Sequence, residues 1–166
     1  MSDVALRRAS NDDIAFIMRV ERQPGYDDLV GRWEYAEHEA ALGDPANAYL
    51  IGLDGLEPRG FAIFRRVDGD APYLQRAAVI GAGAGYGGRF IEAVMDWAFA
   101  NTQATRVTLD VMVHNARARR VYDRLGFRED GAARASNRAD GALMQPMAIA
   151  RADWAMRRDG AVEPSA

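Results

Sequence analysis

The sequence predicts one α/β (α+β) domain, built on a mixed, mostly antiparallel central sheet of about seven strands with about four helices. Three observations predict this fold class. The chain has 166 residues, of which 49% are hydrophobic, which is enough for a substantial core. Three apolar, strand-like runs follow one another with only short turn sequences between them. Segments with helical periodicity lie on both sides of these runs.

The first predicted elements are a strand and a capped helix. Residues 4–8 form a short strand-like segment. Ser10 and Asp13 then make a capping-box pattern, in which a hydroxyl at the N-cap is followed three residues later by an acid. Apolar residues at helical spacing within 14–18 give the helix one buried stripe, and the Gln-Pro-Gly-Tyr sequence at 23–26 ends it.

A second helix is predicted over residues 27–42, because the next turn signal is the Gly-Asp-Pro sequence at 43–45. Its acids are expected to lie mostly on a solvated face, and they weakly favour a cationic partner near this helix. The acidic residues are Asp27, Asp28, Glu34, Glu37 and Glu39.

Three strands are predicted next, over residues 48–53, 60–67 and 73–79. Asp-Gly pairs separate them, at 54–55 and 68–69. Such pairs favour hairpin turns because glycine readily takes a positive φ. Since both connections are short, we expect the three strands to form an antiparallel meander.

A glycine-rich turn follows the third of these strands. Five glycines occur within residues 81–88, and a helix is predicted over 87–100. Glycine lets backbone N–H groups converge, and a helix start adds unpaired N–H groups, so the segment suits a pyrophosphate. The alternative is a mobile surface turn. Residues 83–88 also fit the dinucleotide pattern G-x-G-x-x-G, but that pattern belongs after the first strand of its domain rather than after a meander.

The C-terminal half continues with a strand at 106–113, rich in β-branched residues, and a helix at 115–125. Residues 127–131 and 143–150 are the last strand candidates, and a polar loop at 132–141 separates them. The order of helices and strands therefore differs from the repeated strand–helix units of a dinucleotide-binding domain.

Composition narrows the classes of function. The net charge is −3, and neither lysine nor cysteine occurs. This excludes a disulfide framework and a thiol nucleophile, and it gives no general attraction to nucleic acid or to an anionic membrane. No apolar run has the length of a membrane span, and the N-terminus lacks a signal-peptide core. We therefore expect a cytoplasmic protein with a single domain over residues 1–155 and a disordered tail over 156–166.

Two motifs together make the chain resemble the GCN5-related N-acetyltransferase (GNAT) superfamily. The family's acetyl-CoA motif, Q/R-x-x-G-x-G/A, is similar to residues 82–87. Its second motif, N-x-x-A-x-x-x-Y-x-x-x-G-F, is similar to residues 115–127, with Asn115 at a natural N-cap and Tyr122 two helical turns later. Taken alone, Tyr122 reads as an aromatic core residue. The resemblance covers nearly the whole chain.

The resemblance implies where acetyl-CoA would bind. The fourth and fifth strands, at 73–79 and 106–113, would splay apart, and the pantetheine would pair with the fourth strand in the gap. The pyrophosphate would lie on the glycine turn and on the helix start. The implied cofactor-binding residues are Ala77, Ala78, Val79, Gly83, Ala84, Gly85, Tyr86, Gly87, Gly88, Asn115 and Tyr122.

The resemblance also implies direct attack of an acceptor amine on the thioester, within a ternary complex. A free amine has a pKa of roughly 10.4, so a base or a water chain must remove a proton. Asp110 lies five residues before Asn115, where bacterial ribosomal-protein alanine acetyltransferases carry a glutamate base. Tyr122 would donate a proton to the leaving thiolate, and a backbone N–H of the splayed strand would stabilise the oxyanion.

Two departures from the family pattern leave other functions open. Ala82 stands where the family usually has Gln or Arg, and the glycine turn is short, so the backbone must hold the phosphates. One alternative is a CoA-binding regulatory module without turnover, and a less favoured one is a dinucleotide-binding oxidoreductase. A metal site is not expected, since the chain has two histidines and no cysteine.

The acceptor is expected to be a protein N-terminal amine, a polyamine or another small amine, and a homodimer is a possible assembly. The acceptor mouth would lie between the first two helices and the loop before the last strand. The segments that would line it are residues 22–26, Trp33, Glu34, Glu37 and residues 132–141. Nothing in these segments names one substrate.

Overall fold

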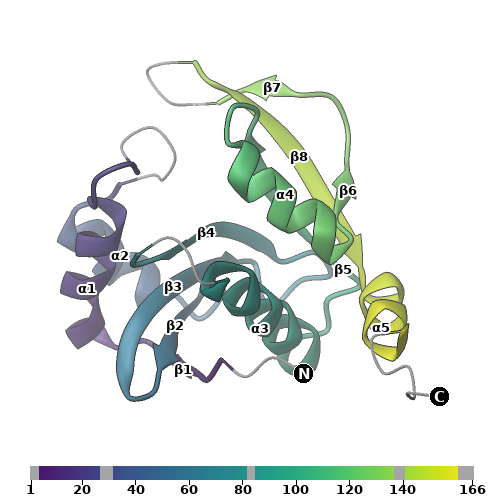
Figure 1. Cartoon of the computed structure of the whole chain (residues 1–166). Coiled ribbons are helices and arrows are strands. Elements are labelled where there is room, and N and C mark those ends of the chain that lie inside the picture. The colour runs from purple at the N-terminus through teal and green to yellow at the C-terminus, as the bar shows by residue number, and fades with distance from the viewer. Residues whose placement is uncertain (1–3, 27–31, 82–84, 137–140, 161–166) are drawn as a thin grey trace.

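A mixed sheet with helices on both faces forms the body of the molecule (Figure 1). The structure is a computed structural model, and it describes residues 4–26, 32–81, 85–136 and 141–160. Within these residues the sheet has eight strands in the order β1-β2-β3-β4-β5-β8-β6, with β7 paired to β8, which confirms the predicted fold class. In chain order the elements are β1 (Leu6–Arg8), η1 (Asn11–Asp13), α1 (Ile14–Glu21), α2 (Tyr35–Leu42), β2 (Ala48–Asp54), β3 (Glu57–Arg65), β4 (Tyr73–Val79), α3 (Tyr86–Asn101), β5 (Arg106–Met112), α4 (Ala116–Leu125), β6 (Arg128–Glu129), β7 (Arg134–Ala135), β8 (Leu143–Ala150) and α5 (Arg151–Gly160).

Strands β2, β3 and β4 form the predicted antiparallel meander. The turn between β2 and β3 places Gly55 at φ 63°, as its Asp-Gly sequence predicts. The turn between β3 and β4 differs from the prediction, because Arg66 (φ 56°) takes the positive φ and Gly69 does not. Gly69 closes this turn instead, by donating its N–H to the carbonyl of Arg66 at 3.1 Å. A left-handed conformation costs a residue with a side chain about 1–2 kcal/mol.

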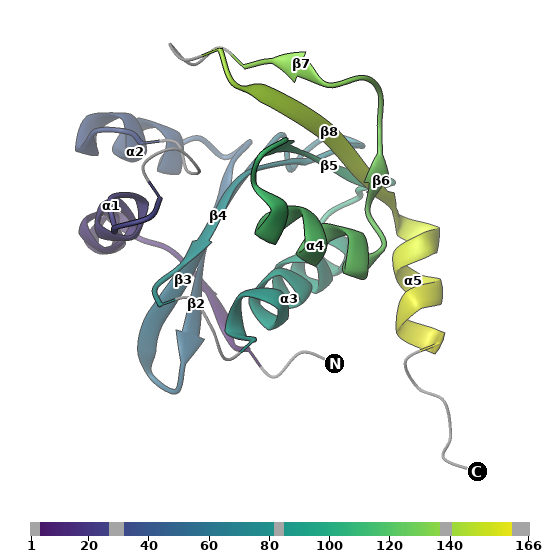
Figure 2. The ribbon, with the colours of Figure 1, turned by 45° about the horizontal axis from the view of Figure 1, so that its top comes forward.

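Strands β4 and β5 part from each other shortly after they begin. They run parallel, and within the described residues they pair only at Tyr73 with Thr108 and at Leu74 with Leu109. Beyond these pairs β4 stays with β3, and β5 stays with β8 as far as Met112. Figure 2 shows the two strands separating. This confirms the expected splay, which we call the fork.

Each face of the sheet has its own helices and its own core (Figures 1 and 2). Helices α3 and α4 cover one face, where Val107, Leu109 and Val111 of β5 join the larger core. Helices α1 and α2 cover the opposite face over the smaller core. Because side chains alternate along a strand, Thr108 and Asp110 lie on the face opposite α3 and α4.

Polar side chains are also buried beneath α1 and α2. Glu21 and His38 are fully buried, and Glu21 Oε1 lies 2.5 Å from His38 Nε2. His38 Nδ1 lies 2.9 Å from the hydroxyl of Tyr49, and Arg76 of β4 donates to Glu21 Oε2 at 2.9 Å. The Trp33 ring covers the Arg76 guanidinium, 4.2 Å from ring centroid to carbon. The network therefore ties both helices to β4 just beyond the fork.

The capping signals near the N-terminus are confirmed, but α2 begins later than predicted. Ser10 donates its N–H to Asp13 Oδ2 at 2.8 Å, which completes the predicted capping box. Of the predicted helix at 27–42, residues 27–31 lie outside the described residues, and α2 starts at Tyr35. Glu34 and Glu37 form its capping box, with the Glu34 N–H donating to Glu37 at 3.1 Å.

The expectation of a disordered tail from residue 156 is wrong as far as Gly160. Residues Arg151–Gly160 form α5, and residues 161–166 lie outside the described residues. Trp154 is buried and donates its ring N–H to Asp96 of α3 at 3.0 Å. Arg158 adds ion pairs to the same helix. One buried aromatic ring and these charged contacts order a segment whose composition resembles a tail.

None of the helices in the described part of the chain combines the length and the apolar character that a membrane span requires.

Candidate active site at the fork

The edge of β4 that faces the fork is open to an extended ligand. Beyond Leu74, the backbone of β4 pairs with β3 alone, at Ala77, Ala78 and Val79. An extended chain can add to such an edge through main-chain hydrogen bonds. The structure thus places all three predicted strand residues at the fork.

The carbonyl of Val79 is already occupied by the connection between α1 and α2. It accepts hydrogen bonds from Gln23 Nε2 at 2.7 Å and from the Tyr26 hydroxyl at 3.0 Å. A carbonyl oxygen has two lone pairs, so this group is satisfied without an added strand. The segment expected to line the acceptor mouth therefore also contacts the end of β4.

The described part of the glycine turn leads into the start of α3. Gly83 and Ala84 lie outside the described residues, and Gly85 takes a left-handed conformation (φ 73°) at the N-cap. Arg89 donates the first helical hydrogen bond, to Gly85 at 3.3 Å, so the N–H groups of the residues between them have no acceptor within the helix. A Cβ added to Gly85 or Gly88 would meet nothing within 4 Å. These open N–H groups fit a phosphate.

Within this turn, Tyr86 and Gly87 offer backbone atoms rather than side chains. The Tyr86 ring is turned inward, 2% exposed, and is stacked on Phe90. The first turn of α3 carries no acid that would repel a phosphate. Arg59 lies over the Tyr86 ring at 4.5 Å and is itself paired with Asp54 at 2.8 Å.

Tyr122 lies on α4, on the face of the sheet that α3 also covers. Asn115 caps this helix as predicted, accepting the Ala118 N–H at 3.1 Å, and Gly126 (φ 99°) ends it. The Tyr122 ring meets Phe127 edge-on, at 5.4 Å between centroids. Its hydroxyl has no hydrogen-bond partner among the described residues. Burial raises the pKa of Tyr122 to about 12, so the phenol stays protonated at neutral pH.

Asp110 is the first residue of β5 beyond the two positions at which β5 pairs with β4. Its Oδ2 accepts the Tyr73 hydroxyl at 2.8 Å, and Arg134 of β7 donates to both carboxylate oxygens at 3.0 and 3.1 Å. Burial and the bond to Asp110 raise the pKa of Tyr73, which keeps that phenol protonated. The Asp110 side chain is 11% exposed, whereas that of Arg134 is 63% exposed and lies over it.

The structure does not bring Asp110 and Tyr122 together on one side of the sheet. Val111 joins the core shared with α4, so its neighbour Asp110 lies on the opposite face. The fork opens between them, because β4 and β5 are unpaired there. The two predicted catalytic side chains therefore lie on opposite faces of the sheet.

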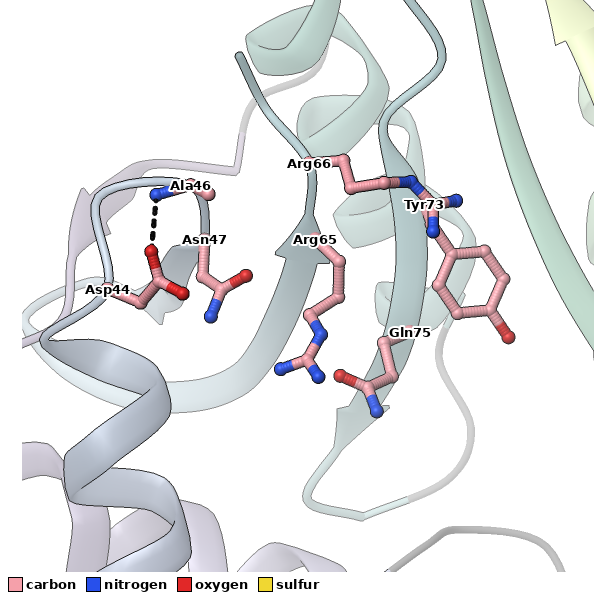
Figure 3. Close-up of a pocket in the computed structure, with 7 residues that line it drawn as sticks. All are labelled: Asp44, Ala46, Asn47, Arg65, Arg66, Tyr73 and Gln75. Carbon is pink, nitrogen blue, oxygen red and sulfur yellow. Dashed lines mark hydrogen bonds between the residues drawn. The ribbon is translucent and has the colours of Figure 1, made fainter. Parts of the chain in front are cut away.

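Two hollows formed by described residues lie on the sheet face opposite α3 and α4, which we call the Asp110 face. The larger, drawn in Figure 3, holds about 450 Å³, and the smaller holds about 300 Å³. Arg66 and Tyr73 line both hollows. The larger is lined by Asp44, Ala46, Asn47, Arg65, Arg66, Tyr73 and Gln75. The smaller is lined by Arg66, Tyr73, Arg106, Thr108, Leu109, Asp110, Asp130, Arg134, Pro146 and Met147. Among the described residues, no group of three acidic, histidine or cysteine side chains could hold a metal ion.

Sequence reasoning missed the partners of Asp110 and the buried carboxylate Glu21. Tyr73 and Arg134 lie 37 and 24 residues from Asp110, so only the strand register brings them together. Glu21 had a local signal, because it lies seven residues after Ile14 and so falls on the apolar stripe of α1.

Comparison with known proteins gives a family match and a shared fold. A family model described as the acetyltransferase (GNAT) family matches residues 14–127, more than half of the chain. The spermidine N-acetyltransferase of Vibrio cholerae, solved with CoA and spermine, has 18% identity and a TM-score of 0.80, covering 93% of this chain and 99% of that one. AAC(6')-Ib, solved with paromomycin and acetyl-CoA, has 20% identity and a TM-score of 0.75, covering 93% and 97%. At these identities the two structures share the fold.

Proposed function

Because this chain belongs to the GNAT family of acetyltransferases, we propose that it moves the acetyl group of acetyl-CoA to a primary amine by direct attack at the fork. The fork is the observation that carries this proposal, since β4 and β5 pair at two positions and then part. The family match favours this function over the dinucleotide-binding alternative. The acceptor and the donor would be bound together, as the family resemblance implies, and the chain has no cysteine that could form a thioester acyl-enzyme.

The donor side of the fork would be made largely of backbone. The open edge at Ala77 and Ala78 pairs with the pantetheine arm, and the free N–H groups at the start of α3 hold the pyrophosphate. Bound acetyl-CoA supplies an acetyl group that is already activated as a thioester. A backbone N–H on the open edge of β4 stabilises the charge on the carbonyl oxygen, and such a donor is worth roughly 10²–10³ in rate.

On the acceptor side, Asp110 receives the proton that the ammonium must lose before it attacks. Its carboxylate lies where the strands part, and Tyr73 holds one of its oxygens from the neighbouring strand. Arg134 lies over the carboxylate from a two-residue strand and is largely exposed, so an incoming amine can displace it. General bases of this kind contribute about 10²–10⁴ in rate.

Tyr122 donates its proton to the leaving sulfur from the other face. A phenol whose pKa is about 12 is a weaker acid than a free phenol, and an ordinary thiol has a pKa near 8.5. The desolvation that raises the pKa of Tyr122 also raises the proton affinity of a thiolate beside it, which narrows the gap between the two groups. The unpartnered hydroxyl is free to turn toward that sulfur.

Thiol release with a panel of amines tests this function directly. The chain has no cysteine, so every free thiol in the assay comes from acetyl-CoA. We expect amine-dependent release, together with a rise in the unfolding midpoint on adding acetyl-CoA, because the ligand binds the folded state. Stabilisation by acetyl-CoA without release from any amine would instead support a regulatory CoA-binding module. Stabilisation by NAD(P) alone would support an oxidoreductase.

The solved relatives widen the acceptor panel. Their descriptions name spermidine, spermine and an aminoglycoside, which are small polycationic amines. The panel should therefore include an aminoglycoside besides the polyamines, other small amines and protein N-terminal amines suggested by the sequence.

A further inference from the structure

The Asp110 face carries two arginines that have no carboxylate partner among the described residues. Arg65 and Arg66 stand at the end of β3 and line the larger hollow, and Arg66 also lines the smaller one. The other arginines around the smaller hollow are paired, Arg106 with Asp130 at 3.0 Å and Arg134 with Asp110 at 3.0 Å. Two positive charges are therefore left for a ligand.

The backbone of Arg66 is held in a left-handed conformation that is unfavourable for a residue with a side chain. Arg66 takes a φ of 56°, although a glycine stands three residues later in the same turn. Its guanidinium lies over the Tyr73 ring at 5.6 Å, and Figure 3 shows the side chain reaching across from β3 toward Tyr73. This puts the charge where the two hollows meet. Backbone strain of this kind persists where it positions a functional group.

Gln75, which lines the larger hollow, carries an unsatisfied polar atom. Gln75 follows Leu74, the last residue of β4 that pairs with β5, and its Oε1 is buried without a hydrogen-bond partner in the described part of the chain. Leaving such an atom unpaired costs about 1–3 kcal/mol. Since no described group holds this oxygen, a small rotation of the amide would let it accept an N–H group of a bound molecule. Figure 3 shows the Gln75 amide and the Arg65 guanidinium directed into the same space.

We propose that the acceptor is a small amine that also carries an anionic group, a carboxylate or a phosphate. This proposal rests on the proposed function of the fork. Arg65 and Arg66 hold the anion, because guanidinium groups bind both kinds of anion through paired hydrogen bonds. The amino group reaches Asp110, because the two hollows share Arg66 and Tyr73. Hollows of about 450 and 300 Å³ suit a ligand of amino-acid size.

A polycation fits the same surface poorly. A polyamine would bring further positive charge to the unpaired Arg65 and Arg66, and like charges at close range repel. Of the acids that favoured a cationic acceptor in the sequence, Glu34 and Glu37 cap α2, Glu39 is exposed, and Asp27 and Asp28 lie outside the described residues. Asp44, at the rim of the larger hollow, already accepts the Ala46 N–H at 2.9 Å.

Matched pairs of amines test the proposal. Each pair differs by the anionic group alone: lysine against 1,5-diaminopentane, and phosphoethanolamine against ethanolamine, with spermidine as a polycation. Thiol release gives kcat/KM for each amine, and calorimetry in the presence of CoA gives Kd. We expect the anionic member of at least one pair to be favoured tenfold or more in both measurements. The pair that shows the larger preference identifies the anionic group of the acceptor as a carboxylate or as a phosphate.

Substitutions then connect the preference to the arginines. Arg65→Gln and Arg66→Gly should each reduce the preference for the anionic amine about tenfold. Arg66→Gly should not lower the unfolding midpoint, because glycine relieves the strained φ. Arg19→Gln, which removes one exposed charge on α1, is the matched control and should leave the preference unchanged.

The outcomes separate this proposal from the function on which it rests. A preference for neutral amines or spermidine in wild type, or a preference that neither substitution reduces, overturns the proposal while leaving the transferase intact. Absence of thiol release from every amine overturns the proposed function. In that case the calorimetric preference and its response to Arg65→Gln still decide whether the hollow binds anionic amines.

Discussion

The hydroxyl of Tyr122 is the atom whose removal tests the proposed proton donation to sulfur. We expect Tyr122→Phe to lower kcat by about 10²-fold or more, while the KM for acetyl-CoA changes little. The ring keeps its contact with Phe127, and the lost hydroxyl leaves no described partner unpaired. Steady-state kinetics of the variant measure this, with Tyr35→Phe at an exposed tyrosine as the control. Unchanged turnover in Tyr122→Phe would remove this residue from the mechanism.

Asp110 is tested by a change that keeps its shape and removes its charge. Asp110→Asn should lower kcat/KM about 10²-fold at neutral pH, and raising the pH should recover part of the loss, because the amine then arrives already deprotonated. Asp54→Asn is the control, since Asp54 is also paired to an arginine, Arg59 at 2.8 Å, but lies at the far end of β2. Equal losses in the two variants would contradict a special role for Asp110.

Residues whose contacts are local could be predicted from the sequence, and residues whose contacts depend on register could not. The capping pairs Ser10 with Asp13 and Asn115 with Ala118 span three residues each, and both formed as predicted. The bond from Tyr73 to Asp110 depends on how β4 lies beside β5. No pattern within either strand contains that information.

At the scale of elements, the close packing of β2 on α3 leads to a prediction about stability. A Cβ added to Gly52 would lie 2.5 Å from two ring atoms of the fully buried Phe90. Because that ring is held in the core, Gly52→Ala should destabilise the fold by about 1–3 kcal/mol. Gly43→Ala is the control, since its Cβ would meet nothing closer than 3.5 Å and its φ is not positive. Urea unfolding of both variants measures the difference, and equal midpoints would contradict this reading of Gly52.

The elements themselves divide by the kind of signal that predicts them. The meander β2–β3–β4 followed from short turns and apolar runs, whereas the fork followed from the family resemblance alone. The turn at 68–69 was expected to use glycine for its positive φ, and Arg66 took that conformation instead. Helix α5 was missed because its arginines and acids gave it the composition of a tail, while Trp154 and the ion pairs to α3 order it.

For the whole molecule, the absence of lysine and cysteine means that the tyrosines are the side chains whose ionisation governs stability between pH 10 and 12. Burial raises the pKa of Tyr49 and Tyr122 to about 12, against about 10 for an unfolded chain. Between these values the unfolded chain has lost protons that the folded chain keeps. The free energy of unfolding should therefore hold below pH 10 and fall as the pH rises toward 12.

Urea midpoints measured between pH 9 and 11.5 check this dependence, with tyrosinate absorbance as the parallel signal. Tyr122→Phe should make the fall less steep, because one buried proton no longer contributes. An equally steep fall in wild type and variant would mean that Tyr122 ionises at the same pH in both states. Loss of activity between pH 8 and 10 should not come from Tyr122, which remains protonated there.

The separation of Tyr122 and Asp110 by the sheet also bears on the order of events in a catalytic cycle. If the coenzyme departs past α3 and α4 and the modified amine departs past α1 and α2, neither product blocks the exit of the other. The two products could then leave in either order. Each product would be a competitive inhibitor with respect to the substrate that uses the same side of the sheet. On the proposed function we therefore expect random release of the two products, because the sheet separates Tyr122 from Asp110.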